Sequence, residues 1–369
     1  MDGFLQKCRE PRQKNDSPSS GEDDKSRCVL FTTGDRPLTT TTLLPQANLN
    51  DAAEIQRLIC VRHPYYALEG LRVISRGSVE CFVQAEQDLG SEVPPMRAAE
   101  AGRHMAILGS FALASLGERQ GQHFYLAKAA RLEGLSALPA MLPFQLLEPI
   151  PLRGHAYASF TGKREGQAVV TLTTEAGLET HKLIVEYNVL SRATFYRLFA
   201  AHRVDLRRWE RGSITAPVSR ITPDDRWECV DAVGSLTVPH PLRNNPYKDS
   251  IPLAAFTIED RAARAEIPCI TPDMCNGHFA EVPLLPIAIV MGSLSQVAGA
   301  LFLALNGNPT RYRVLSADIA AHRFAEAGKA LFLTASLTEI RCEQVFTFRC
   351  EATTTDGLVG EMSISLASD

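Results

Sequence analysis

Two groups of residues in this chain have the types and spacing of acid–base chemistry. His278 stands in a Gly277-His278-Phe279 tripeptide that precedes a long apolar stretch. Glu100 and His104 are four residues apart in an earlier apolar stretch, so they would share one face of a helix. A neutral histidine and a protonated carboxylic acid can together remove one proton and deliver another. The residue types of the two groups are therefore compatible with proton-transfer chemistry.

Each of these residues also has a structural explanation. A histidine in such a tripeptide is more often a structural or surface residue, and Glu100 and His104 on an amphipathic helix would form a solvated pair. The stretch around Glu100 is apolar on most faces, however, and a buried carboxylate is costly without a partner or a function. We therefore favour a functional Glu100 over a solvated one, with His104 placed to orient Glu100 or the substrate.

The two apolar stretches must be the elements that position these groups. The first is expected to form a helix over residues 94–117, because prolines precede its apolar periodicity and Gly117 ends it. The second is expected to be helical over residues 283–305 and also opens with prolines. Strand-like runs surround both stretches, so each half of the chain has an α+β pattern.

The second half repeats the order of elements of the first, which predicts a duplicated domain rather than a solenoid. We expect a first domain over residues 46–203 and a second over residues 226–369. A polar linker rich in breakers is expected over residues 204–225. Residues 1–45 are poor in apolar periodicity, so a disordered tail is expected there.

Composition excludes several classes of protein. Hydrophobic residues make up 45% of the 369 residues, which predicts a packed globular body. The net charge of −4 argues against a nucleic-acid partner bound through phosphates. Residues 282–305 form the longest apolar run, and polar residues interrupt it, so no membrane span is expected. Nine scattered cysteines without a CxxC pair favour reduced thiols in the cytoplasm. The histidines have no metal-ligand spacing, so neither metal nor cofactor is expected.

The segment from Gly277 to Gln296 resembles the signature of the 3-hydroxyacyl-(acyl carrier protein) dehydratases, a hotdog-fold family whose pattern is roughly GHFPGxPxxPGxxxxEAxAQ. Six residues match it at the right spacing: Gly277, His278, Phe279, Pro283, Pro286 and Gln296. The resemblance implies a double hotdog, in which two antiparallel sheets are continuous with each other and each wraps a long central helix. It also implies a lyase of fatty-acid or polyketide biosynthesis.

The chain departs from this pattern in a complementary way. The family places an acid fourteen residues after the histidine, where this chain has Gly292. The first half has the acid, Glu100, but Glu86 stands fourteen residues before it instead of a histidine. In the family, the histidine of one fold works with the acid of its partner. The resemblance therefore implies one composite site of His278 with Glu100, and a decayed site of Glu86 with Gly292.

By resemblance, His278 removes the α-proton of a 3-hydroxyacyl thioester and Glu100 protonates the leaving hydroxyl, which gives the enoyl thioester. Six residues are expected to contact the substrate: His104, Gly277, Phe279, Pro286, Ile287 and Met96. The backbone N–H groups of Ile287 and Met96 are the expected donors to the thioester carbonyl, because Pro95 replaces the family's glycine and has no N–H. The substrate is expected to be linked to acyl carrier protein or coenzyme A. The protein would be a monomeric pseudodimer or a homodimer of double hotdogs.

Two alternatives stay open. The same fold could catalyse another thioester reaction, as a thioesterase, an isomerase or a cyclase, and Glu100 would serve as the carboxylate of a thioesterase. The chain could also be a non-catalytic partner subunit of a biosynthetic complex, since Glu281 and Ile287 replace two signature glycines.

Overall fold

The computed structural model describes residues 58–117, 122–135, 151–200, 218–221, 227–230, 245–279, 281–307, 311–341 and 344–368. The expected tail over residues 1–45 lies outside them. So does the expected linker over residues 204–225, apart from the short strand β7 (Val218–Ile221), which pairs with β8 (Trp227–Val230).

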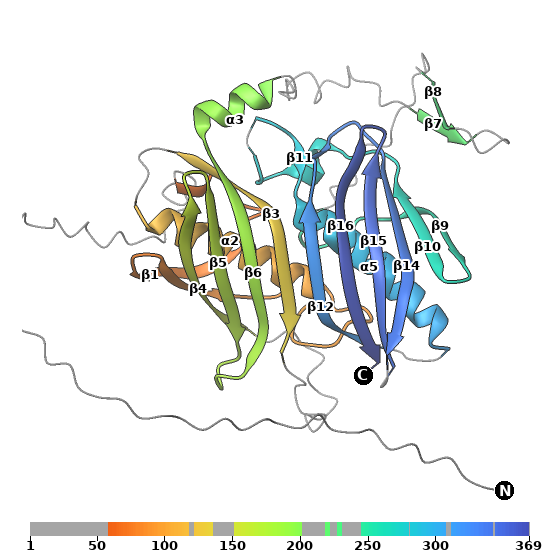
Figure 1. Ribbon diagram of the computed structural model, residues 1–369, viewed down its shortest axis with the longest axis horizontal. Helices are drawn as coiled ribbons and strands as arrows, with labels where there is room; N and C mark the ends of the chain where they lie inside the picture. Colours follow the sequence, from red (N-terminus) through yellow and green to blue (C-terminus); the bar gives the residue numbers. More distant parts are fainter. Residues whose placement is uncertain are drawn as a thin grey trace, which may run out of the picture. The chain divides into compact units, whose positions relative to one another are not determined.

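One antiparallel sheet of twelve strands runs through both halves of the described chain (Figure 1). The strand order is β1-β2-β4-β5-β6-β3-β12-β16-β15-β14-β10-β9. The first half contributes β1 (Leu68–Ser75), β2 (Ser78–Val83), β3 (His123–Gly134), β4 (Leu152–Gly162), β5 (Glu165–Thr173) and β6 (Glu179–Ser191). The second half contributes β9 (Ala254–Glu259), β10 (Ala262–Ile267), β12 (Tyr312–Ala321), β14 (Leu331–Arg341), β15 (Val345–Thr354) and β16 (Gly357–Ser368).

The halves join where β3 pairs with β12, with Leu132 opposite Ala317. Alternation along the strands buries one face of the sheet: on β15, Phe346, Phe348 and Cys350 are buried, while the residues between them are more exposed. Beyond the sheet, the second half adds the 3-10 helix η2 (Pro272–Cys275) and the short pair β11 (Leu284–Leu285) and β13 (Ala325–Glu326). Helix α3 (Arg192–Leu198) follows β6.

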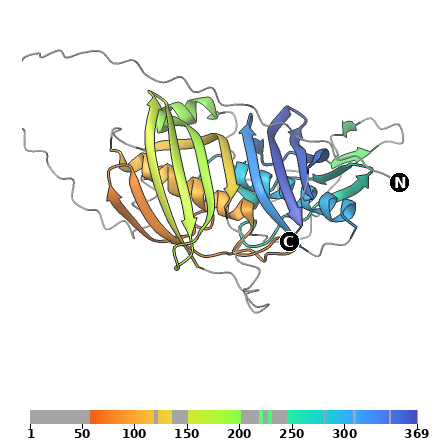
Figure 2. The same ribbon diagram turned by 60° about the horizontal axis from the view of Figure 1, so that its bottom comes forward.

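A long helix packs against the strands of each half (Figure 2). Helix α2 (Ala98–Ser115) contacts β4 and β5, and helix α5 (Ile287–Leu305) contacts β14 and β16. Both helices begin four residues later than the sequence predicts. The prolines explain the difference, because the conformation they impose on the preceding residue is extended rather than helical. Pro286 is the N-cap of α5, and β11 occupies the two residues before it.

The architecture confirms the double hotdog that the sequence predicts. The two central helices contact each other where Gly292 of α5 faces Ala99 of α2: a Cβ atom on Gly292 would lie 3.5 Å from the Ala99 Cβ. Within the described ranges, α5 is the one helix whose length and composition would suit a membrane span, and more than half of it is buried inside the protein.

Candidate functional site

The loop that carries His278 is held against the first half of the chain. The Arg62 N–H donates to the Gly277 carbonyl at 2.9 Å. Gly277 has a φ of +79°, and a Cβ atom there would lie 2.4 Å from the Arg62 carbonyl oxygen and 2.7 Å from the Tyr65 nitrogen. Glycine is therefore required at this position, both for its φ and for the close approach of the two backbones.

His278 is held as a neutral base. Its Nδ1 atom lies 3.1 Å from the Leu284 carbonyl oxygen, which can only accept, so Nδ1 carries the proton. Burial lowers the pKa of His278 to about 4. The Phe279 ring stacks on the imidazole at 3.8 Å between ring centroids, and the Tyr65 ring lies at 4.9 Å. The Nε2 atom is left with a free lone pair at neutral pH.

His278 lines a cavity of about 480 Å³, called here the main cavity. Both halves of the chain contribute to it. Helix α2 contributes Ala106, Ile107 and Ser110, and the second half contributes His278, Phe279, Leu284, Leu285, Ile287 and Ala288. The rest of its lining includes polar residues: Lys128, Asn188, His322, Arg323, Glu326, Thr354 and Asp356. Of the residues expected to contact substrate, Phe279 and Ile287 are brought together with His278.

A second, narrower cavity of about 60 Å³ lies between α2 and α5 and is called here the interhelical cavity. Its helix walls are Ala98, Ala99, Gly102 and Ala106 of α2 and Ile287, Ala288, Met291 and Ser295 of α5. It adjoins the main cavity, because the two have several lining residues in common: Ala106, Ala127, Lys128, Ile287, Ala288 and Ala321. The main cavity therefore leads into a slot with almost entirely apolar walls.

The N-terminus of α5 lies where these two cavities meet. Ile289 and Val290 donate the first helical hydrogen bonds, both to the Pro286 carbonyl. The N–H groups of Ile287 and Ala288 precede those bonds, and helix N-termini favour negative charge. This terminus can therefore stabilise an oxyanion, as the sequence predicts for Ile287.

Glu100 does not line the main cavity. It lines a third cavity, with Arg97, Arg103, Gly292 and Gln296, called here the Glu100 cavity, which shares Ala288 with both other cavities and Ala99 with the interhelical cavity. The expectation of one cavity shared by His278 and Glu100 is therefore not met. Along α2, Ala106 is the residue of the main-cavity lining nearest to Glu100, and it follows Glu100 by six residues, about 9 Å along the helix axis.

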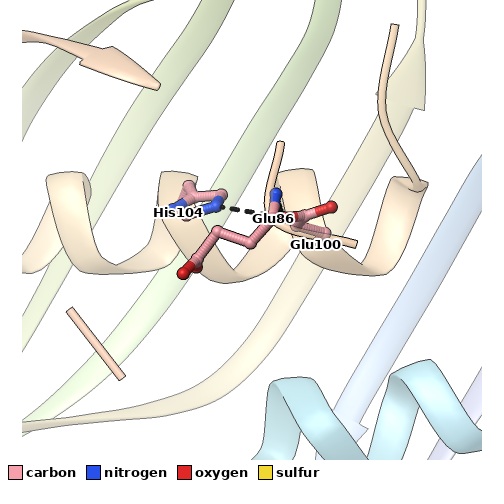
Figure 3. A group of neighbouring side chains, drawn as sticks. All are labelled: Glu86, Glu100 and His104. Atoms are coloured by element: carbon pink, nitrogen blue, oxygen red, sulfur yellow. Dashed lines mark hydrogen bonds and ion pairs between the residues drawn. The ribbon is translucent and has the colours of Figure 1, made fainter. Parts of the chain in front are cut away.

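The surroundings of Glu100 form a buried ionic network (Figure 3). Its Oε1 atom accepts a hydrogen bond from the Glu86 N–H at 2.5 Å and lies 3.6 Å from Nε2 of His104. The Arg103 guanidinium pairs with the Glu86 carboxylate and lies 3.8 Å from Oε1 of Glu100. Burial, followed by the charge of Arg103, lowers the pKa of His104.

Glu86, Glu100 and His104 have ligand atoms within 4.8 Å of one another, which is the spacing of a metal site. The Arg103 guanidinium also lies inside this group, 3.1 Å from Nε2 of His104. Its positive charge takes the place that a cation would need. We therefore assign the group to the ionic network, in which His104 contacts neither the main cavity nor the interhelical cavity.

The start of α2 differs from the start of α5 in one respect. The Glu92 carboxylate accepts a hydrogen bond from the Ala98 N–H at 2.9 Å, so a side chain of the protein occupies the anion position there. Met96, an expected donor to the substrate, is 1% exposed and lies beside Glu92 rather than in the main cavity. Pro286 and Gly277 were also expected to contact substrate, and both hold the backbone of the site in place. Pro286 is the N-cap of α5, and Gly277 lets the His278 loop pack against Arg62 and Tyr65.

Sequence reasoning missed Tyr65, Ala106, Ser110 and the polar lining residues of the main cavity. They carry no local motif and reach the site through pairing of the two halves.

No family model matches the sequence, and no curated protein matches it. Solved structures with similar backbones exist. A 12:0-ACP thioesterase from Umbellularia californica has a TM-score of 0.45 and 8% identity, covering 79% of this chain and 95% of that chain. An acyl-ACP thioesterase from Bacteroides thetaiotaomicron has a TM-score of 0.44 and 8% identity, covering 79% of this chain and 98% of that chain. A hot dog fold protein of unknown function from Alicyclobacillus acidocaldarius has a TM-score of 0.45 and 13% identity, covering 84% of this chain and 99% of that chain.

Proposed function

We propose that this chain is an enzyme of acyl thioesters, that His278 is its base, and that hydrolysis is the reaction its site supports best. The observation that carries the proposal is the neutral His278 imidazole, fixed through Nδ1, at the wall of a cavity that leads into an apolar slot. One base is sufficient for hydrolysis. The carboxylate needed for a two-residue dehydration lies in the Glu100 cavity instead.

In this mechanism the acyl chain enters the interhelical cavity, and its carbonyl oxygen lies at the N–H groups of Ile287 and Ala288. Nε2 of His278 takes a proton from water, and the water oxygen attacks the carbonyl carbon. The helix N-terminus stabilises the oxyanion. The carbon–sulfur bond then breaks, and the imidazolium returns its proton to the thiolate. The low pKa of His278 favours that return, because its imidazolium is a strong acid.

Dehydration of a 3-hydroxyacyl thioester is the second candidate. The tripeptide at Gly277 to Phe279 favours it, and the bond to Leu284 leaves Nε2 free to take an α-proton as readily as a proton from water. The role of Glu100 as the acid of that reaction stays a prediction. It would require Glu100 and His278 to reach one substrate from different cavities.

The test is incubation of the purified protein with matched saturated and 3-hydroxyacyl thioesters of coenzyme A and of acyl carrier protein, followed by mass spectrometry. We expect free acid and thiol from both substrates, with activity lost in His278→Ala. The matched control is His322→Ala, because His322 lines the same cavity but is exposed and pairs with Glu361. Loss of water without release of acid would support dehydration. Tight binding without turnover would overturn both reactions and leave a non-catalytic subunit.

A further inference from the structure

Ser295 differs from the other serines of the two central helices. Ser110, Ser115 and Ser293 each donate a hydrogen bond to a carbonyl of their own helix, at 2.7, 2.7 and 3.2 Å. Ser295 is 4% exposed, and its Oγ atom is buried without a hydrogen-bond partner in the described part of the chain. It lines the interhelical cavity.

The walls around Ser295 are apolar. Apart from Ser295, the one polar residue of that lining is Lys128, and its ammonium pairs with Glu165 and Glu186 at 3.2 Å each. An ordered water needs two to four polar partners, and the lining offers Ser295 alone as a free side chain. A buried hydroxyl without a partner costs about 1–3 kcal/mol, and alanine is the better helix former. Ser295 therefore has a cost that the fold does not offset.

The wall of the interhelical cavity formed by α2 has unfilled space beside Gly102. Gly102 of α2 lines the interhelical cavity, and a Cβ atom built on it would meet nothing within 4 Å. Neither its backbone angles nor close packing requires glycine, which weakens a helix interior by about 1 kcal/mol relative to alanine. Gly102 thus keeps space open for a ligand, across the cavity from the α5 wall that carries Ser295.

We propose that Ser295 determines substrate specificity, by donating a hydrogen bond to an oxygen substituent carried far along the acyl chain. This inference rests on the proposed function, because it takes the interhelical cavity as the place of the acyl chain. The substrate class is therefore a chain with a distal hydroxyl or keto group, rather than a plain saturated chain. An oxygen atom in the chain satisfies Ser295, whereas a methylene leaves it unpaired.

The position of Ser295 fixes where that oxygen must be. Ser295 follows Ala288 by seven residues, which is about 10 Å along the helix axis. The thioester carbonyl is placed at the N–H group of Ala288, so the oxygen lies well beyond the third carbon. Met291 and Met362 line the same cavity, and their flexible side chains can move to admit a chain wider than the present slot.

The experiment measures binding in the His278→Ala protein, so that turnover does not enter it. The probes are acyl-coenzyme A analogues in which a methylene replaces the thioester sulfur. One set is saturated, and the others carry a hydroxyl or a keto group at successive carbons. Calorimetry should show about tenfold tighter binding of a distally oxygenated chain than of its saturated match, from one hydrogen bond that would otherwise be missing.

Ser295→Ala should reduce that ratio to about one, and Ser295→Thr should keep most of it. Ser293→Ala is the matched control, because Ser293 is a buried serine two residues away that is already bonded to Ile289. An unchanged ratio in Ser295→Ala would overturn the inference, as would strongest binding with oxygen at the third carbon or no binding of any chain. A ratio that depends on Ser295, together with no hydrolysis of any thioester by the wild-type protein, would support this inference while rejecting the proposed hydrolysis.

Discussion

The Nδ1 atom of His278 and the carbonyl oxygen of Leu284 are 3.1 Å apart, and this contact decides which nitrogen of the ring can act as a base. A carbonyl only accepts, so the proton is on Nδ1 and the lone pair is on Nε2. The two residues flank the loop that leads into β11 and α5, so the same short segment positions both the base and the helix N-terminus.

The first prediction concerns the pH dependence of catalysis. The pKa of His278 is lowered from 6.5 to about 4 by burial, so its base form persists well below pH 6.5. We expect kcat/KM to stay level from about pH 8 to pH 5 with respect to this group, and to fall as the pH approaches 4. The ¹⁵N resonances of the ring should show an Nδ1-protonated neutral imidazole over that range. A midpoint near pH 6.5 in both measurements would contradict the assignment.

The second prediction concerns Glu100. In hydrolysis with His278 as the base, Glu100→Gln should change kcat by less than about threefold, since Glu100 does not line the main cavity and the amide keeps its shape. A general acid is worth on the order of 10² to 10⁴ in rate, so a loss of that size would instead establish Glu100 as the acid of dehydration. The assay uses the saturated and 3-hydroxyacyl thioesters side by side.

A variant of the neighbouring Glu86 completes the second prediction: Glu86→Gln should affect stability more than rate. The variant removes the nearer of the two carboxylate partners of Arg103, which is 2% exposed, and breaking a buried ion pair destabilises a protein strongly. We expect a loss of roughly 3 kcal/mol in the free energy of unfolding, measured in urea, with kcat unchanged in the remaining folded protein. A variant as stable as the wild type would show that Glu100 alone neutralises Arg103.

The sequence predicts the elements of this fold well, and the composite site less well. The two apolar stretches opened by prolines become α2 and α5, and the tripeptide at His278 becomes a loop at a cavity wall. The relation of His278 to Glu100 could not be read from spacing within each half. It depends on the position of α2 relative to α5 along the two helix axes. That position is set by contacts such as Ala99 with Gly292 and by the pairing of β3 with β12.

Local patterns also conceal the difference between the two helix starts. Pro94 and Pro286 occupy matching places, yet only α2 has a carboxylate on its first N–H groups. Glu92 lies six residues before Ala98 in an irregular segment, and nothing in its neighbours predicts the contact. The same holds for Ser295, whose lack of a partner is a property of the assembled cavity.

The third prediction concerns Glu92. Burial raises the pKa of its carboxyl group from 4.5 to about 7, so the folded protein holds a proton there that the unfolded chain releases. Stability should therefore fall as the pH rises from about 4.5 through 7, by on the order of 3 kcal/mol for a shift of this size. Glu92→Gln should remove this part of the slope and unfold at higher urea than the wild type at pH 8. The exposed Glu175→Gln is the control, and an unchanged slope in Glu92→Gln would contradict the assignment.

The fourth prediction concerns Gly102. Two substitutions at this residue distinguish an effect on the stability of α2 from an effect on the volume of the interhelical cavity. Gly102→Ala should stabilise the protein by about 1 kcal/mol, because a Cβ atom meets nothing within 4 Å and alanine favours the helix. Gly102→Leu should fill the cavity beside Met291 and Ser295 while leaving His278 untouched. Its kcat/KM should therefore fall at least tenfold for long acyl thioesters and little for acetyl thioesters. Equal losses for both chain lengths would show that the chain lies elsewhere, and equal thermal unfolding of Gly102→Leu and the wild type would exclude misfolding as the cause.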